Sequence, residues 1–267
     1  MPAEKTTAII LRVVDFSETS CVVTMYTEDY GKVSALAKGA RRLRSPFEGA
    51  IDLLSICRIV FLRKSVDVLD LLTEARLERR FRSASTHLSR LYAAMYVIEL
   101  VSALTDHADP QPKLFHMIAG TIQELDEQEA TPTRLLQFEL QLLDQLGHLP
   151  ALQTCVECGE SVEGQSATES VSFGLLAGGV FCSRCRIGKR STVKLKQETL
   201  GWMRELSGVE PACMLSATVT RDRETTGPTA MPAAVRGEMR GVLDQYTANL
   251  LGYRPRTTAW LRQVFRD

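Results

Sequence analysis

The sequence predicts an α+β protein with more than one domain: an N-terminal five-stranded OB-fold barrel, then an α-helical domain with an inserted four-cysteine zinc knuckle. Three observations predict this architecture. Residues 6–77 contain short apolar runs separated by turn-forming residues, and the apolar period changes from two to about 3.6 near residue 78. Two C-x-x-C pairs follow within residues 155–185. We therefore expect one domain at 1–80 and a second at 81–267.

Five apolar runs are interpreted as the strands of the barrel. They lie at Thr6–Val14, Ser20–Thr27, Lys32–Ala37, Ile56–Leu62 and Val66–Leu77. The long connection between the third and fourth runs, at 38–55, is typical of an OB-type barrel. Counting strands does not distinguish this fold from an SH3-like barrel, so the second fold stays an alternative.

Helical periodicity begins after the barrel. Apolar residues recur in steps of three and four across 88–98, which lines one helix face. Thr131 and Pro132 are typical of an N-cap followed by the first helical residue, and the leucine stripe after them predicts a buried helix. Residues 208–232 are rich in Thr, Pro and Gly, which predicts a mobile loop. Further helices are expected near 197–206 and 235–250.

The two C-x-x-C pairs predict a structural zinc site. The pairs are separated by 23 residues, and each places two thiolates on a single turn of the chain. Four sulfur ligands close a tetrahedral site and leave no position for water or substrate, so a catalytic zinc is disfavoured. The expected ligands are Cys155, Cys158, Cys182 and Cys185.

Other uses of these cysteines fit less well. A thioredoxin-type redox motif needs a strand before it and a helix that starts inside it, whereas Pro150 lies upstream and two pairs occur. A zinc deaminase needs an H-x-E motif that the chain lacks. Disulfides would require an oxidising compartment, and residues 1–5 lack the pattern of a secretory signal. We expect a cytoplasmic protein with reduced or metal-bound thiols.

Charge and motif content argue against an enzyme. The chain has 32 basic and 32 acidic side chains, but residues 83–157 carry 10 acidic and only 3 basic ones. The four histidines lie in no acid–base or metal pattern, and neither glycine-rich phosphate-binding motif is present. No apolar run reaches the 18 residues of a membrane span.

A cluster of cations after the third predicted strand indicates nucleic-acid binding. Four cations occur in the seven residues 38–44, where the chain leaves the sheet at the barrel mouth and flexible side chains could neutralise phosphates. Two further cations, Arg63 and Lys64, lie at the turn between the fourth and fifth predicted strands and could extend this surface. Few aromatic residues lie among the cations (Phe47, Trp260), so binding dominated by base stacking is not favoured. The candidate DNA-binding residues are Lys38, Arg41, Arg42, Arg44, Arg63 and Lys64.

Several stretches carry a resemblance to a known family. They are Ala37–Arg42 in the barrel, Phe138–Leu140 with Leu142-Leu143, Leu146–Pro150 and Cys155–Gly159, Phe173 with Gly178-Gly179, and Tyr246 with Leu251–Arg256 near the C-terminus. On these residues the chain resembles the bacterial RecO family of recombination mediators, and the likeness spans nearly the whole chain.

The resemblance implies an OB-fold and a helical domain that bears the zinc site. It also implies binding of single- and double-stranded DNA, annealing of complementary strands, and work with RecR to load recombinase onto DNA coated by single-strand-binding protein. RecF is a further expected partner, and the protein would be associated with the nucleoid. Some family members lack the cysteines, which supports a structural role for zinc.

Two other classes of function stay open at this point. One is a zinc-knuckle adaptor that binds other proteins and never touches DNA. The other is a metal-dependent hydrolase of nucleic acid, which four sulfur ligands around zinc would exclude because they leave no room for a reactive water.

Overall fold

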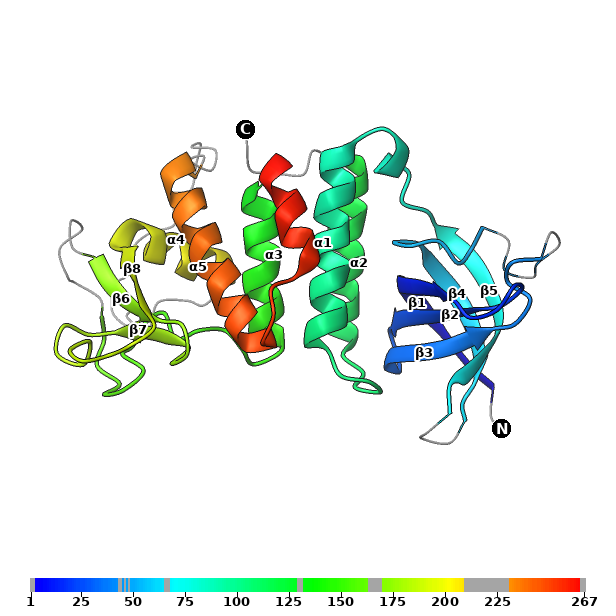
Figure 1. Ribbon diagram of the computed structural model, residues 1–267, viewed down its shortest axis with the longest axis horizontal. Coiled ribbons are helices and arrows are strands. Elements are labelled where there is room, and N and C mark those ends of the chain that lie inside the picture. The colour runs from blue at the N-terminus through cyan, green and yellow to red at the C-terminus, as the bar shows by residue number, and fades with distance from the viewer. Residues whose placement is uncertain are drawn as a thin grey trace, which may run out of the picture. The chain divides into compact units, whose positions relative to one another are not determined.

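The computed structural model describes residues 3–42, 45, 47, 49–64, 68–128, 132–162, 170–208 and 231–264. Contacts divide the chain into two compact units, the first of Met1–Ala130 with Ala259–Asp267 and the second of Thr131–Thr258. Figure 1 shows the elements of both. Arg44 and residues 209–230 of the expected mobile loop lie outside the described residues.

The first unit begins with a closed five-stranded barrel. Its strands are β1 (Ala3–Asp15), β2 (Cys21–Thr27), β3 (Gly31–Ala37), β4 (Ile56–Leu62) and β5 (Asp70–Arg79). The order is β1-β2-β3-β5-β4, and β1 also pairs with β4 to close the barrel. All pairs are antiparallel except β3 with β5. The OB-type barrel is therefore confirmed.

The fifth strand begins later than the sequence predicted. It starts at Asp70, whereas the prediction began at Val66. Val68 and Leu69, which belong to the same apolar run, are 50% and 40% exposed and precede the strand. An apolar run alone therefore placed the strand start too early, because these two side chains lie on a connecting segment.

A β-bulge near the middle of β1 changes which side chains face the barrel interior. The register against β2 shifts between Ile10 and Arg12, which leaves Leu11 as an extra residue. Before the bulge Ile10 faces the interior, and after it Val13 packs against the interior while Val14 is exposed. The bulge therefore decides which residues at the end of β1 reach solvent.

A helical hairpin completes most of the first unit. It consists of α1 (Leu88–Leu104) and α2 (Pro112–Glu127), preceded by the short 3₁₀ segment η1 (Ser83–Ser85). The sequence predicted α1. It gave no bounds for α2, although four buried apolar residues recur there in steps of four, four and three: Leu114, Ile118, Ile122 and Leu125.

Lys32 attaches the barrel to this hairpin. Its side chain is buried, and the ammonium donates hydrogen bonds to the carbonyls of Ser102 (2.7 Å) and Thr105 at the C-terminal end of α1. Burial lowers the pKa of Lys32. Neighbouring Gly31 has φ +65°, and a Cβ there would lie 2.2 Å from the Asp109 carbonyl oxygen. Only glycine allows this close approach.

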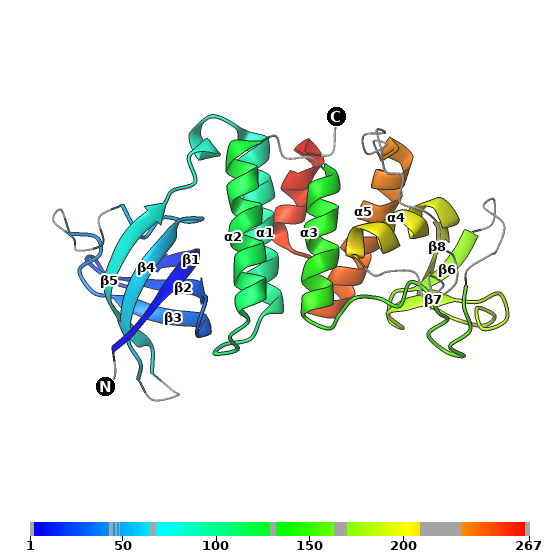
Figure 2. The same ribbon diagram turned by 180° about the vertical axis from the view of Figure 1, so that it is seen from behind.

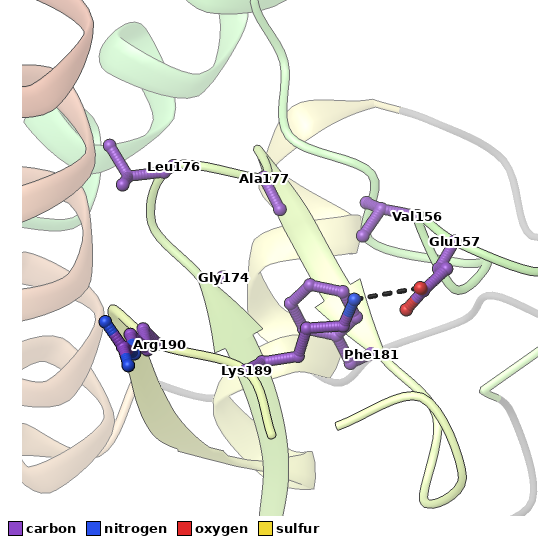
Figure 3. Close-up of a pocket in the computed structure, with 8 residues that line it drawn as sticks. All are labelled: Val156, Glu157, Gly174, Leu176, Ala177, Phe181, Lys189 and Arg190. Atoms are coloured by element: carbon purple, nitrogen blue, oxygen red, sulfur yellow. Dashed lines mark hydrogen bonds and ion pairs between the residues drawn. The ribbon is translucent and has the colours of Figure 1, made fainter. Parts of the chain in front are cut away.

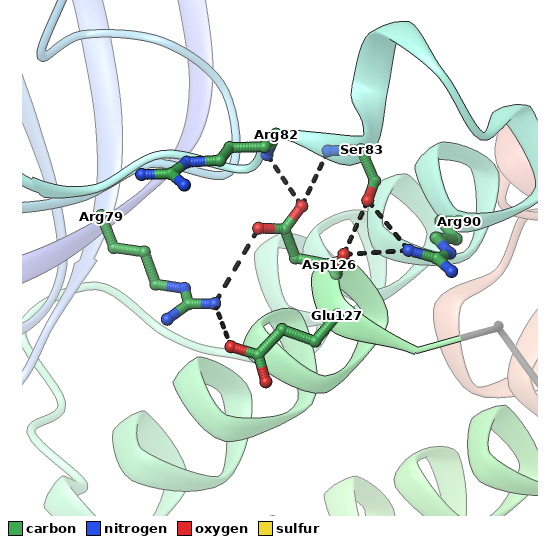
Figure 4. A network of polar contacts seen from close by, with 6 residues as sticks. All are labelled: Arg79, Arg82, Ser83, Arg90, Asp126 and Glu127. Carbon is green, nitrogen blue, oxygen red and sulfur yellow. Dashed lines mark hydrogen bonds and ion pairs between the residues drawn. The ribbon is translucent and has the colours of Figure 1, made fainter.

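A second polar network holds the other side of the junction (Figure 4). The Asp126 carboxylate at the end of α2 accepts hydrogen bonds from the backbone N–H groups of Arg82 (2.8 Å) and Ser83 (2.7 Å). Arg90 donates to the Asp126 carbonyl oxygen (3.1 Å), and Arg79 lies 3.9 Å from its carboxylate. Arg79 therefore joins the barrel to the end of α2, and Arg90 joins α1 to the same end.

The second unit combines three helices with a small sheet (Figure 2). The predicted helices appear as α3 (Pro132–Gln145), α4 (Gln197–Ser207) and α5 (Ala233–Leu251). The 3₁₀ segment η2 (Arg256–Gln263) contains residues of both units. Strands β6 (Ser170–Gly174) and β7 (Gly179–Phe181) pair as an antiparallel hairpin. A third strand, β8 (Thr192–Lys196), pairs with β6 and was not predicted.

The core of the second unit contains a buried ion pair as well as leucines. Glu139 of α3 is fully buried, and Arg240 of α5 contacts both of its carboxylate oxygens at 2.6 and 3.2 Å. Thr247 also donates to Glu139 (2.9 Å), and Asp244 pairs with Arg240 (2.6 Å). Burial is the main cause that raises the pKa of Asp244. The leucine stripe predicted the buried helix but gave no sign of this pair.

Within the part of the chain that the structure describes, no helix combines the length and apolar character that crossing a membrane requires.

Candidate metal centre and nucleic-acid interface

The four cysteines of the two C-x-x-C pairs come together in the second unit. The sulfur atoms of Cys155, Cys158, Cys182 and Cys185 all lie within 4.8 Å of one another. The Sγ atoms of Cys158 and Cys182 are 3.8 Å apart. A tetrahedron of sulfurs about 2.3 Å from a central zinc has edges of about 3.8 Å. The donor set and its spacing therefore fit a metal ion bound by four sulfurs.

Each C-x-x-C pair is held by a tight turn. In the first, the Gly159 N–H donates to the Cys155 carbonyl (2.9 Å), and Gly159 has φ +72°, which favours glycine. In the second, the Arg186 N–H donates to the Cys182 carbonyl (3.1 Å). These turns place the two sulfurs of each pair on the same side of the backbone.

Backbone N–H groups prepare two of the thiols to lose their protons. Burial opposes ionisation of Cys155, but the N–H groups of Cys182, Cys158 and Glu157 outweigh it and lower its pKa to about 6. The pKa of Cys182 is also lowered, chiefly by the Cys185 N–H. Hydrogen bonding to Cys182 raises the pKa of Cys185 to about 12. A bound metal ion would displace the remaining thiol protons, because the thiolate is the ligand.

The small sheet supports the first cysteine pair. The Val156 N–H donates to the Val180 carbonyl (3.0 Å), and the Val180 N–H donates to the Ala151 carbonyl (2.9 Å). A Cβ at Gly179 would lie 2.6 Å from both the Ala151 oxygen and a Val156 methyl group. The second glycine of the Gly178-Gly179 motif is therefore required for the chain to pass this close to β7.

Helix α5 holds the segment that leads into the cysteine pair. The Tyr246 hydroxyl donates to the His148 carbonyl (2.8 Å), and its ring contacts Phe173 edge-on with centroids 6.0 Å apart. These contacts give physical roles to Tyr246, His148 and Phe173, three of the residues that carried the resemblance.

A pocket of about 340 Å³ lies beside the first cysteine pair (Figure 3). Phe181 and Val156 belong to its apolar lining, and Leu176 at its edge is 75% exposed. The Lys189 ammonium lies 5.5 Å from the Phe181 ring centroid and pairs with Glu157 (2.8 Å). Lys189, which follows the second cysteine pair in the chain, is therefore neutralised by a local carboxylate.

The cations after β3 lie at one end of the barrel, next to the turn between β1 and β2. We call Lys38, Arg41 and Arg42, together with turn residues 16–20, the barrel rim. All three cations are exposed. Arg41 pairs with Asp15 at 3.0 Å, and its N–H donates to the Thr19 carbonyl (3.1 Å).

A pocket of about 350 Å³ opens at this rim. Arg41, Arg42 and Asp52 supply charge, while Val13 and Phe47 supply apolar surface. The pocket therefore combines cations with apolar surface at the end of the barrel.

The structure does not bring Arg63 and Lys64 to the barrel rim. They follow β4, whose last residue, Leu62, pairs with Ala3 at the start of β1. Arg41 pairs with Asp15 at the opposite end of the same strand. The Arg63 guanidinium instead lies 4.9 Å from the centroid of the Tyr30 ring. The two groups of candidate residues are therefore separate surfaces.

Sequence reasoning overlooked Phe16, which belongs to the barrel rim and is 63% exposed. It lies two residues beyond Val14, where the apolar run of the first strand ends, and Asp15 separates it from that run. The bulge at Leu11 reverses the pattern, and no local sequence signal marks that shift.

Comparison with known proteins identifies the family. The model of the recombination protein O N-terminal region matches residues 1–81, and that of the C-terminal region matches residues 85–259. The DNA repair protein RecO of Rhodopirellula baltica is 41% identical over 95% of this chain and 97% of its own length. Its counterpart in Myxococcus xanthus is 31% identical over 97% of both chains. That of Symbiobacterium thermophilum is 34% identical over 74% of this chain and 77% of its own. These matches span both units, and the chain therefore belongs to the recombination protein O (RecO) family.

Proposed function

We propose that this chain is a DNA-binding recombination mediator that acts in DNA repair. It binds single- and double-stranded DNA, anneals complementary strands and helps load recombinase onto DNA coated by single-strand-binding protein. RecR, single-strand-binding protein and RecF are its expected partners, in the cytoplasm at the nucleoid. Support comes from the family, whose relatives are named DNA repair proteins, and from an OB-type barrel, a fold that often binds oligonucleotides.

The observation that carries this proposal is the exposure of the cations at the barrel rim. The Arg41–Asp15 pair joins side chains that are 47% and 66% exposed. Such a surface ion pair contributes only about 0–1 kcal/mol, so a phosphate can replace Asp15 at little cost. Each phosphate contact releases counterions and strengthens binding without selecting a base sequence.

Annealing needs no covalent chemistry from the protein. Strands held close together pair through their own complementary bases, so we infer that the protein is not an enzyme. We assign residues 1–80 as the DNA-binding domain and 81–267 as the helical domain. The separate family models for 1–81 and 85–259 support that boundary.

We assign zinc to the four cysteines as a structural ion. Bound zinc would neutralise the thiolates and cross-link two distant turns, and Cys155, Cys158, Cys182 and Cys185 would fill all four positions. The knuckle would then support the second unit without contacting a reacting group.

The test is a DNA titration at two salt concentrations. Labelled DNA single strands of about 30 nucleotides and duplexes of about 30 base pairs are titrated with the protein at about 50 and 200 mM salt. We expect Lys38→Ala/Arg41→Ala/Arg42→Ala to weaken binding to both and to reduce the salt slope by about 2 for single strands, since each lost contact removes about 0.7. Strand annealing, followed by energy transfer between labelled strands, should slow in parallel.

Arg63→Ala/Lys64→Ala is the matched variant at the other end of β1. It shows whether the second surface also contacts DNA. A wild-type protein that binds neither single-stranded nor duplex DNA would contradict the proposal. That result would favour a zinc-knuckle adaptor that binds other proteins.

A further inference from the structure

The aromatic side chain of Phe16 is exposed to solvent. It is 63% exposed, more than Tyr253 (53%) or Trp260 (41%). A single exposed apolar residue is common on protein surfaces and needs no explanation by itself. The residues around Phe16 are the evidence that its exposure serves binding.

The backbone at Phe16 is fixed by the turn between β1 and β2. The Phe16 and Ser17 N–H groups both donate to the Ser20 carbonyl, at 3.0 and 3.1 Å. The Ser20 N–H returns a hydrogen bond to the Ser17 hydroxyl (3.2 Å). Because the turn is closed on itself, the aromatic ring is presented from a defined position.

The two chain neighbours of Phe16 both contact the same cation. The Arg41 guanidinium lies 3.0 Å from the Asp15 carboxylate and donates to the Ser17 carbonyl (3.4 Å). Exposed Arg42 follows directly in the chain. The rim therefore places an exposed ring beside cations that could hold phosphates.

An exposed ring beside cations is the combination that recognises unpaired nucleic acid. Aromatic side chains bind the faces of bases while cations follow the sugar-phosphate chain. In OB-type barrels the connection between the first two strands is among the loops that contact oligonucleotides. A duplex hides its base faces within the stack, so only an unpaired base can lie on the ring.

We propose that Phe16 stacks on one unpaired base, so that the barrel rim prefers single-stranded to duplex DNA. This inference rests on the proposed DNA binding and assigns the preference to one residue. Stacking covers the face of the base and leaves its pairing edge free. A strand held in this way remains able to pair with a complementary strand.

The experiment compares Phe16 variants on single-stranded and duplex DNA of the same length. Phe16→Ala and Phe16→Leu should weaken single-strand binding about 5- to 100-fold, since a base–aromatic contact has that effect. Duplex binding should change less than about twofold, and Phe16→Tyr should keep wild-type affinity for both. The salt slope should be unchanged in every Phe16 variant, because the phosphate contacts remain.

Val68→Ala is the matched control. Val68 is 50% exposed and apolar, and it lies in the β4–β5 connection, away from the barrel rim. It should leave both affinities unchanged. A fluorescent 2-aminopurine base placed along the strand should be quenched by wild type and Phe16→Tyr, and not by Phe16→Leu.

Several results would overturn the inference. Equal losses of affinity for single strands and duplexes would mean that Phe16 contributes to DNA binding without a preference for either. Wild-type affinity in Phe16→Leu would mean that any apolar side chain suffices and that the aromatic ring does not stack on a base. Unchanged DNA affinity with an altered oligomeric state would make Phe16 a protein contact. If the wild type bound neither single-stranded nor duplex DNA, the proposed function itself would fail. If the triple cation variant lost DNA binding while the Phe16 variants kept it, the inference on Phe16 would fail and the proposed function would stand.

Discussion

The barrel rim and the core of the second unit use arginine in opposite ways. At the rim, Arg41 and its partner Asp15 are 47% and 66% exposed, so water competes for both. In the core, Arg240 is 10% exposed and binds the fully buried Glu139 through two nitrogens. The same chemical pair is weak and exchangeable in one place and fixed in the other, because burial decides whether water can replace a partner.

This difference separates binding from support. A surface that exchanges partners can accept phosphates, whereas a buried pair cannot be broken without exposing a charge to an apolar core. Two members of the cysteine cluster belong with the second kind, since Cys155 and Cys182 are buried and held by backbone N–H groups, whereas Cys158 is exposed. Stability variants should therefore act through the second unit, and binding variants through the rim.

Removing the metal should have the largest effect. Cys155→Ser, or a strong chelator, should destabilise the second unit by several kcal/mol, since metal binding and folding are coupled. Limited proteolysis would then cut within 131–258 while the barrel survives, and metal analysis of the wild type should give about one zinc per chain. A metal-free wild type with the same protease resistance would contradict the assignment.

Breaking the buried pair should come next. Glu139→Ala removes the carboxylate that contacts two nitrogens of Arg240 and should cost roughly 3–5 kcal/mol, measured from the urea midpoint. Replacing both partners with leucine should recover part of that loss, because the Glu139 charge is gone and Asp244 keeps its pair with Arg254 (3.3 Å). Asp15→Ala is the surface counterpart and should cost at most about 1 kcal/mol. Equal losses at the two sites would remove the contrast between the regions.

A glycine substitution tests the close contact behind the cysteine pair. Gly179→Ala would place a Cβ 2.6 Å from the Ala151 oxygen and should destabilise by about 1–3 kcal/mol. Gly201→Ala in α4 is the control, because no atom lies within 4 Å of its added Cβ. That change should stabilise the helix by up to about 1 kcal/mol, so thermal melts of the two variants should shift in opposite directions.

The smallest change in stability should accompany a gain in binding. Asp15→Asn removes the carboxylate that competes with phosphate for Arg41 and should alter unfolding by less than about 1 kcal/mol. DNA affinity at low salt should rise a fewfold, and the gain should shrink as salt screens the surface. Weaker binding would mean that Asp15 positions Arg41 for its ligand.

Local patterns predicted the elements that local residues determine. Alternating strands, the leucine stripe of α3 and the C-x-x-C pairs could each be recognised within a short window. The Glu139–Arg240 pair joins residues 101 positions apart, so no window contains both. Arg63 was placed with Arg41 because both follow strands, but strand order alone does not say which end of β1 each reaches.

The segment around Gly31 and Lys32 determines where the chain can be shortened. Ending the protein at residue 80 would remove the carbonyls of Ser102 and Thr105 that accept hydrogen bonds from Lys32. It would also uncover the surface of β3 against which Asp109 lies. A minimal fragment for nucleic-acid work should therefore keep the helical hairpin through residue 128. A barrel alone would expose Lys32, which is buried against α1 in the intact chain.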